Sequence, residues 1–353
     1  MRNPLPVNVS RVAPGAARLF CWGLVGLLLL ACERQPQPEM IYISGQTMGS
    51  SYHITAVRQP HQADAAGLQP LLEQRLAQLD LVFSQYRPDS ELSKLNNDQK
   101  KTKVTLSPEL AQVLAASLLI GQASGGALDV TLGPVIDLWG FGKDAALPRR
   151  PDPAALAQAR ARSGLDKIKL QGRELEYSHP AVELNFNAIA PGFAADEIAG
   201  LLIALDYSGF LVDIGGELIA HGTKLDGSPW VLGIERPDPI GRKVYKKIAL
   251  TNKALATSGD YRNFFEEAGH RYQHSLNPQT GEPVTHQLAS VSVIHDSVMM
   301  ADGWATAIMV LGPEAGLKLA EAQGLGVFLI WREGAELKEG ATTRFLQFAS
   351  WQD

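Results

Sequence analysis

An aspartate and a threonine stand in an apolar stretch near the end of the chain, "MADGWATAIMVLG", which runs from Met300 to Gly312. Positions four residues apart share one face of an α-helix, so Asp302 and Thr306 point to the same side if the stretch is helical. A carboxylate and a hydroxyl are hard oxygen ligands of the kind that Mg²⁺ prefers, with water and ligand phosphates completing its shell. Asp302 could equally cap the helix while Thr306 bonds back to a carbonyl. On these residues alone, both roles stay open.

The overall composition limits the kind of protein. The chain has 353 residues, of which 45% are hydrophobic, enough to bury a large core in one domain or in two closely joined lobes. Its 32 basic residues face 37 acidic ones without a long basic run, so no electrostatic footprint for nucleic acid is present. The P-loop, the Rossmann glycine motif, the zincin helix, His/Cys zinc spacing and the G-x-S-x-G elbow are all missing from the sequence. The sequence therefore supports none of these classes.

The N-terminus has the pattern of a bacterial export signal. Three arginines and no acidic residue accompany the apolar stretch "LFCWGLVGLLLLA", which is shorter than the about 20 residues of a spanning helix. It ends in "LLAC", which resembles a lipobox and predicts that Cys32 is lipidated. We expect a signal peptide over 1–31, the lipidated cysteine and a polar tether over 32–40, and the body over 41–353. Glu33 resembles the signal for sorting to the outer membrane, which predicts a membrane lipoprotein facing the periplasm; a simple membrane anchor or a soluble secreted protein are the alternatives.

Cysteine usage excludes two kinds of chemistry. The only cysteines are Cys21, inside the signal, and Cys32 at its end. The mature body therefore has no thiol for a disulfide or for nucleophilic catalysis. Its stability must come from its core or from a bound ligand.

The elements that position Asp302 and Thr306 are predicted from periodicity and turn residues. Helices and strands that follow no strict repeat predict an α+β fold with mixed or antiparallel sheets and packed helices. The stretch "FGKDAALPRRPDPAAL" is the expected exposed excursion between two lobes. In chain order we expect two strands in "MIYISGQTMGSSYHITAV", a helix near 69–86, a helix capped by Ser107 and ending near Gly125, a hairpin in "KIKLQGRELEYS", a helix from about Gly192, a strand in "GFLVDIG", further strands to Leu250, a helix from Ala301 and closing antiparallel strands in "GVFLIWREGAELKEGATTRFLQF".

Longer motifs are similar to those of one known family. The segment "ATSGDYRNFFEEAGHRYQHSLNPQTGEPV", from Ala256 to Val284, closely resembles the signature of the ApbE family, the FAD:protein FMN transferases. Several motifs in a fixed order are far more specific than any one of them, and the resemblance covers essentially the whole mature chain. The other blocks, in the family's order, are "QTMGSSY" (46–52), "FSQYRPDSELSKLN" (83–96), "GGALDVTLGPVIDLWGFG" (125–142), "LNFNAIAPGFAAD" (184–196), "LVDIGGELIAHG" (211–222), "PWVLGIERP" (229–237) and "ADGWATA" (301–307).

The resemblance implies both a fold and a reaction. The fold is ApbE-like and related to the T-fold, with FAD bound between the two lobes. Mg²⁺ engages the FAD pyrophosphate and is held by Asp302, Thr306 and the backbone carbonyl of Ala188. The FMN half is transferred to a Thr or Ser hydroxyl of another exported protein, such as an electron-transfer flavoprotein subunit with a D-G-x-[ST]-G-A-[ST]-like segment, and AMP is released.

The resemblance also implies residues for the flavin and for proton transfer. His274 is the candidate base, since an unperturbed histidine has a pKa near 6.5; a structural histidine at a turn is the competing interpretation. Asp302 is catalytic through the cation, and Asp260 either orients the site or caps a turn. Met and Tyr pack well on a flat ring, although either is more often simple core. The flavin contacts carried over by motif are Met48, Tyr86, Ala127, Leu128, Asp129, Asn185 and Ser275.

Three positions depart from the family's pattern. Asn185 stands where many relatives have Asp, Pro191 where they often have Lys, and Asn277 where Asp is common. Because one anion and one cation are lost together, we expect FAD binding to survive, with changes in rate and metal affinity. Two alternative functions stay open: a lipoprotein that binds FAD for storage, and a Mg²⁺-dependent FAD pyrophosphatase in which water replaces the protein hydroxyl.

Overall fold

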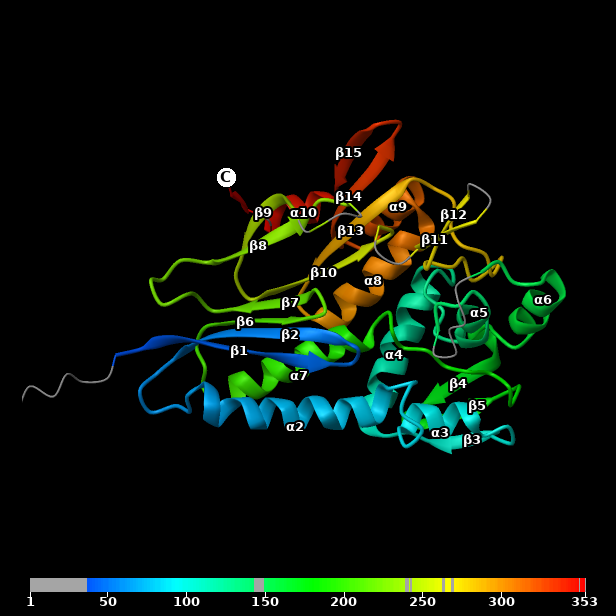
Figure 1. Ribbon diagram of the computed structural model, residues 1–353, viewed down its shortest axis with the longest axis horizontal. Coiled ribbons are helices and arrows are strands. Elements are labelled where there is room, and N and C mark those ends of the chain that lie inside the picture. The colour runs from blue at the N-terminus through cyan, green and yellow to red at the C-terminus, as the bar shows by residue number, and fades with distance from the viewer. Residues whose placement is uncertain are drawn as a thin grey trace, which may run out of the picture. The chain divides into compact units, whose positions relative to one another are not determined.

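The largest element of the computed structural model is an eight-stranded sheet whose neighbouring strands are all antiparallel (Figure 1). The structure describes residues 37–142, 149–238, 241, 243–261, 264–267, 270–348 and 350–352. Residues Glu39–Asp353 form one compact unit. In spatial order the strands are β1 (Glu39–Thr47), β2 (Ser50–Arg58), β6 (Phe210–Ile214), β7 (Glu217–His221), β10 (Lys253–Gly259), β13 (Leu288–His295), β14 (Gly326–Glu333) and β15 (Glu336–Ala341).

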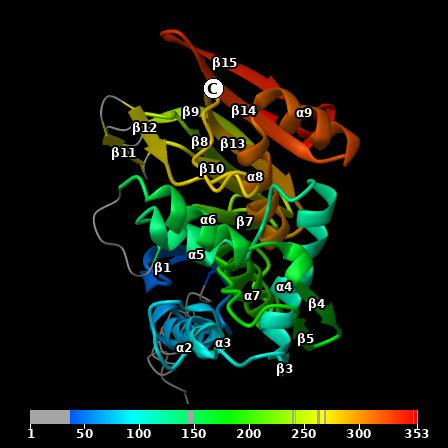
Figure 2. The ribbon, with the colours of Figure 1, turned by 90° about the vertical axis from the view of Figure 1, so that its right-hand side faces the viewer.

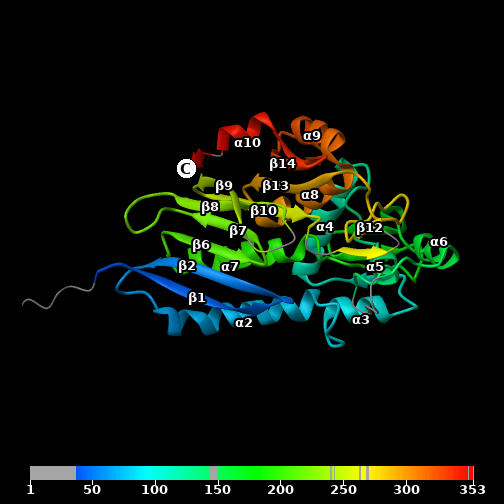
Figure 3. The same cartoon turned by 45° about the horizontal axis from the view of Figure 1, so that its top comes forward.

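The two faces of this sheet pack against different layers. On β10, Ala254 and Ala256 belong to the main hydrophobic core, whereas Leu255 between them packs into a second core on the other face, because side chains alternate along a strand. Helices cover the main core, and a smaller sheet with a short helix covers the second (Figure 3). The helices are α2 (Ala65–Phe83), α4 (Pro108–Ala123), α7 (Ala190–Ala204), α8 (Val298–Leu311) and α9 (Pro313–Ala322); the opposite layer is β8 (Trp230–Glu235), β9 (Val244–Leu250), β16 (Ser350–Gln352) and α10 (Thr343–Phe348).

A third apolar cluster forms around Trp139 and joins segments that are far apart in the chain (Figure 2). The Trp139 ring lies 5.6 Å from that of Tyr272, and its Nε1 donates a hydrogen bond to the carbonyl of Gly281 over 2.8 Å. The elements of this region are α3 (Glu91–Asn97), α5 (Gly133–Leu138), α6 (Pro153–Ala161), a 3₁₀ turn (Leu165–Lys167), the three-stranded sheet of β3 (Lys103–Thr105), β5 (Glu174–Tyr177) and β4 (Ile168–Gln171), and the hairpin of β11 (Phe264–Glu267) and β12 (His270–Gln273).

Most of the expected elements form, and the α+β class is confirmed. The Ser107 side chain accepts a hydrogen bond from the N–H of Leu110, as predicted for the cap of α4. The prediction that the chain closes on strands alone is wrong for Thr343–Phe348, which form α10. Thr342 Oγ1 accepts from the N–H of Phe345 over 3.2 Å, which starts a helix that buries Phe345. In so short an apolar run, periodicity does not separate helix from strand.

The expected boundaries shift at several places. The helices predicted from Gly192 and Ala301 begin at Ala190 and Val298. The expected excursion ends in α6, and its residues 143–148 lie outside the described part of the chain, as do the signal peptide and Cys32. Within the described ranges, no helix is both long and apolar enough to cross a membrane.

Helices α7 and α8 are tied together at two points. The Asp196 carboxylate on α7 accepts hydrogen bonds from Ser297 Oγ over 2.6 Å and from the N–H groups of Val298 and Met299, which caps the start of α8. One turn earlier on α7, Gly192 touches α8 so closely that an added Cβ would lie 2.7 Å from the Val298 carbonyl oxygen. The close approach therefore depends on glycine at this position.

Replacing Gly192 by alanine is expected to destabilise the protein, because the added methyl group must push backbone apart. Overpacking of this kind typically costs about 1–3 kcal/mol. The matched control is Gly200→Ala on the same helix, where an added Cβ meets nothing within 4 Å and should stabilise by about 0.5–1 kcal/mol. Urea unfolding of both variants measures the difference, and equal effects would contradict the contact.

Candidate active site

Two hairpin turns lie next to each other at one end of the large sheet. Residues Met48 and Gly49 join β1 to β2, and Gly215 and Gly216 join β6 to β7. Because β2 pairs with β6 through Tyr52 opposite Ile214, both turns lie at the same sheet end. All four turn residues have positive φ, as a two-residue hairpin favours, with φ 48° at Met48. A methionine in this left-handed conformation is strained, which indicates a functional constraint on the side chain.

Strand alternation turns two polar side chains at this sheet end toward α8. On β7, Leu218 and Ala220 pack into the second core, so Glu217 and Ile219 share the face of the main core. On β10, Ser258 follows Ala254 and Ala256 on that same face. Since β10 continues past the first residue of β7, Glu217 and Ser258 both face the helix that carries Asp302.

A cavity of about 740 Å³ opens at this sheet end. Its ionisable lining residues are Asp129, Glu217, Asp302, Tyr261 and His274, and no Lys or Arg lines it within the described part of the chain. The cavity is therefore acidic, apart from one histidine. Of the residues predicted for the site, it brings together Ala127, Leu128, Asp129, Asn185, Ala188, His274, Ser275, Asp302 and Thr306.

Asp302 is a buried carboxylate in the cavity wall, with 7% of the residue exposed. Its Oδ2 accepts a hydrogen bond from the N–H of Gly192 over 3.1 Å. Burial raises the pKa of Asp302 to about 7, although the Gly192 hydrogen bond opposes the shift. Burial also raises the pKa of Glu217 well above its ordinary range, and the negative charges of Asp302 and Asp213 add to that effect. A cation bound next to these carboxylates would favour their charged forms and so oppose both shifts.

The oxygen atoms beside Asp302 fit a hard divalent cation. Thr306 lies one turn further on α8 and lines the same cavity, with its Oγ1 3.3 Å from Ser258 Oγ. Ala188 also lines the cavity. It lies four residues before Gly192, whose N–H donates its hydrogen bond to Asp302. No group of three or more His, Cys, Asp or Glu side chains suited to a metal occurs among the described residues. Asp302 and Thr306 offer hard oxygen atoms, the kind of ligand that Mg²⁺ prefers, rather than the nitrogen and sulfur ligands typical of Zn²⁺.

Asn185 is held in an amide pair rather than facing the cavity freely. Its Oδ1 accepts from the N–H of Asn187 over 3.0 Å, and its Nδ2 donates to Gln85 Oε1 over 2.9 Å. These two hydrogen bonds fix the orientation of both side-chain amides. They leave Gln85 Nε2 buried without a partner in the described structure. An aspartate at 185 would offer a second acceptor to Gln85, so the departure at this position changes the local hydrogen bonding.

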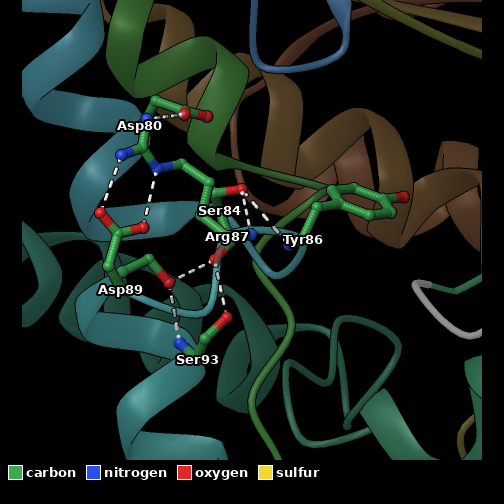
Figure 4. A network of polar contacts seen from close by, with 7 residues as sticks. Asp80, Ser84, Tyr86, Arg87, Asp89 and Ser93 are labelled. Carbon is green, nitrogen blue, oxygen red and sulfur yellow. Dashed lines mark hydrogen bonds and ion pairs between the residues drawn. The ribbon is translucent and has the colours of Figure 1, made fainter.

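Tyr86 and Met48 are the two predicted flavin contacts that do not line the cavity. Tyr86 lies 65% exposed in the loop after α2, and Figure 4 shows its ring pointing away from the network that holds this loop. In that network Ser84 Oγ accepts from the N–H groups of Tyr86 and Arg87, and Arg87 pairs with Asp89 over 2.9 Å (Figure 4). The loop backbone is thus fixed while the aromatic ring stays accessible, and the contact with flavin stays a prediction.

His274 and Ser275 reach the cavity from the segment that follows β12. The His274 ring packs edge-on to Phe141 at 6.4 Å, and the Ser275 carbonyl accepts from the N–H of Val284. The following turn is held by Asn277, whose Oδ1 accepts from the N–H of Gln279, so the expected turn chemistry is present.

Asp260 does not line the cavity. Its carboxylate makes a two-point ion pair with Arg332 over 2.6 and 3.0 Å, inside the protein. The carboxylate is therefore engaged with Arg332 rather than with the cavity, while its neighbours Gly259 and Tyr261 line the cavity.

Sequence reasoning missed two cavity residues, Glu217 and Ser258. Both stand in motifs that resemble those of the family: Glu217 in "LVDIGGELIAHG" and Ser258 in "ATSGDYRN". A carboxylate directly after two glycines at the start of a strand was the available signal for Glu217. Its orientation toward α8 depends on strand pairing, which the motif does not contain.

Comparison with known proteins places this chain in a family. Residues 48–329 match the model of the ApbE family. The FAD:protein FMN transferase of Vibrio cholerae is 38% identical over 328 residues, which are 93% of this chain and 98% of the relative. That of Haemophilus influenzae is 39% identical over 315 residues, 87% of this chain and 90% of the relative.

Solved structures agree with these relatives. The flavin transferase ApbE from Vibrio cholerae matches with a TM-score of 0.82 at 36% identity, covering 88% of this chain and 99% of its own. The apo form of the flavinyl transferase ApbE from Pseudomonas stutzeri also has a TM-score of 0.82, at 39% identity over 89% and 98% of the two chains. This protein is therefore a member of the ApbE family.

Proposed function

We propose that the protein is an FAD:protein FMN transferase that uses Mg²⁺ and releases AMP. The observation that carries the proposal is the cavity in which His274 and the oxygen atoms of Asp302 and Thr306 meet, although they come from segments far apart in the chain. The protein belongs to the ApbE family, and two of its relatives are named FAD:protein FMN transferases; both facts support the proposal.

The charge of the cavity supports a cation in the complex. FAD brings an anionic pyrophosphate into a space whose described lining has three carboxylates and no Lys or Arg. Asp302, Thr306 and the Ala188 carbonyl would hold Mg²⁺. When bound, the cation neutralises charge on the pyrophosphate and on the leaving phosphate.

The transfer needs a hydroxyl, a base and a leaving group. The hydroxyl oxygen of an acceptor Thr or Ser attacks the phosphorus of the FMN half, and the bond from this phosphorus to the bridging oxygen breaks. AMP leaves with the electron pair. His274 takes the hydroxyl proton on an imidazole nitrogen, which requires that this ring is neutral before the reaction.

The N-terminus supports a location for this reaction. We propose that Cys32 carries a lipid and holds the enzyme on a membrane facing the periplasm, where exported electron-transfer flavoproteins provide the acceptor hydroxyl. The polar tether "ERQPQPE" gives the body distance from the membrane surface.

The full-length protein in mild detergent, incubated with FAD, Mg²⁺ and a peptide containing D-G-x-T-G-A-T, tests the activity. Mass spectrometry should find FMN on the threonine, together with one AMP for each adduct. AMP and FMN without an adduct would instead identify a pyrophosphatase, and intact bound FAD would identify a storage protein.

Asp302→Asn is expected to stabilise the cation-free protein at pH 8 while it abolishes transfer. The folded-state pKa of Asp302 is about 7 against an ordinary 3.8, so the folded protein holds a proton that the unfolded chain loses between these values. Stability of the wild type therefore falls as pH rises from about 4 to about 7, by on the order of 1–4 kcal/mol. Asparagine keeps the acceptor for Gly192 and removes this loss. Urea unfolding in EDTA at pH 5 and pH 8 measures the free energy of unfolding of both proteins. The same change with pH in wild type and variant would contradict the prediction.

His274→Gln is expected to slow transfer by about 10²–10⁴-fold with little change in FAD affinity, because it removes the base but keeps a polar side chain. Single-turnover rates at saturating FAD and the dissociation constant of FAD separate the two effects. The control is His179→Gln, an exposed histidine outside the cavity lining. Equal losses of rate and affinity would make His274 a structural residue.

A further inference from the structure

Glu217 is a cavity carboxylate to which the proposed mechanism gives no role. It opens β7 on the sheet face that α8 covers, and it lines the same cavity as Asp302 and Thr306. Its Oε2 lies 3.0 Å from the point where a Cβ on Gly215 would stand, so the carboxylate folds back over the hairpin turn. Within the described residues, no side chain donates a hydrogen bond to it or pairs with it. A side chain in this state is available to a ligand.

The charges around Glu217 indicate what kind of ligand it receives. Asp302 and Asp213 are the carboxylates whose fields reach it, and the cavity offers no Lys or Arg in its described lining. Two carboxylates facing one space attract a cation more strongly than either does alone, because their fields add. An anionic substrate would be repelled from the same position unless a cation lay between the substrate and the carboxylates.

We propose that Glu217 is a positioning residue of the cation site, a second carboxylate that accepts a hydrogen bond from water bound to the divalent cation. This inference rests on the proposed function. It goes beyond the three ligands from Asp302, Thr306 and Ala188, because Glu217 comes from the sheet on the other side of the cavity. Mg²⁺ keeps several of its waters when it is bound by few carboxylates. Outer-shell groups of this kind orient the inner shell and raise affinity.

Two other roles for Glu217 lead to different expectations for ligand binding. If Glu217 only supported its turn, removal of its charge would leave ligand binding unchanged. If it bound sugar hydroxyls of FAD, the same change would weaken FAD binding whether or not a cation were present. A role at the cation predicts a loss of cation affinity and, without a cation, FAD binding that is unchanged or tighter, because a repelling charge is gone.

The experiment compares Glu217→Gln with wild type, both full-length in mild detergent. Mn²⁺ binding in the presence of FAD is followed by electron paramagnetic resonance, and FAD binding in EDTA by quenching of flavin fluorescence. We expect Mn²⁺ affinity to fall about 10- to 100-fold, with FAD binding in EDTA equal or tighter. Glu217→Asp, which keeps the charge, should recover part of the Mn²⁺ affinity.

A matched control is Asp213→Asn, which removes the same charge from the same hairpin outside the cavity lining and keeps an acceptor for the Gly216 N–H. It should change Mn²⁺ affinity much less than Glu217→Gln. If both variants lowered Mn²⁺ affinity equally, the total negative charge near the cavity would explain the loss and the proposal would be overturned. Unchanged Mn²⁺ affinity in Glu217→Gln would also overturn it. If the wild type itself binds no Mn²⁺ with FAD, the metal part of the proposed function fails as well, which separates the two failures.

Discussion

The contact between α7 and α8 at Gly192 is the constraint on which the site depends. At this point one glycine lets two helices approach and gives its N–H to the buried carboxylate of Asp302. Asp196, one turn along α7, caps the start of α8. The first tie sets the position of the carboxylate and the second fixes the helix that carries it. Because a donor and a helix cap belong to the same neighbouring helix, Asp302 and Thr306 are held in place before any ligand binds.

Electrostatics explains why a protein without a cationic side chain in its described cavity lining can handle an anionic dinucleotide. The carboxylates of Asp129, Glu217 and Asp302 make the cavity suited to a cation, and burial, which disfavours the charged forms, raises the pKa values of Glu217 and Asp302.

The sheet contributes to the cavity through the hairpin of β6 and β7, whose residues Gly215 and Glu217 line it. The neighbouring turn of β1 and β2 lies at the same sheet end, outside the cavity lining, and pairing of the two strands on both sides holds Met48 at its positive φ. The Arg87 network fixes the backbone next to Tyr86 without covering its ring. Rigid backbones with accessible side chains are a suitable frame for binding a flat ligand.

The sequence by itself determined local features: the shared helix face of Asp302 and Thr306, the Ser107 cap, the α+β class, and a set of motifs, several of which contribute residues to one cavity. These depend on neighbours within a few residues or on long motifs. Only the tertiary structure decided that Glu217 lines the same cavity as Asp302, that Asp260 pairs with Arg332, and that Asn185 binds Gln85. Strand register and helix packing bring such partners together across long stretches of chain, and local periodicity contains no information about them.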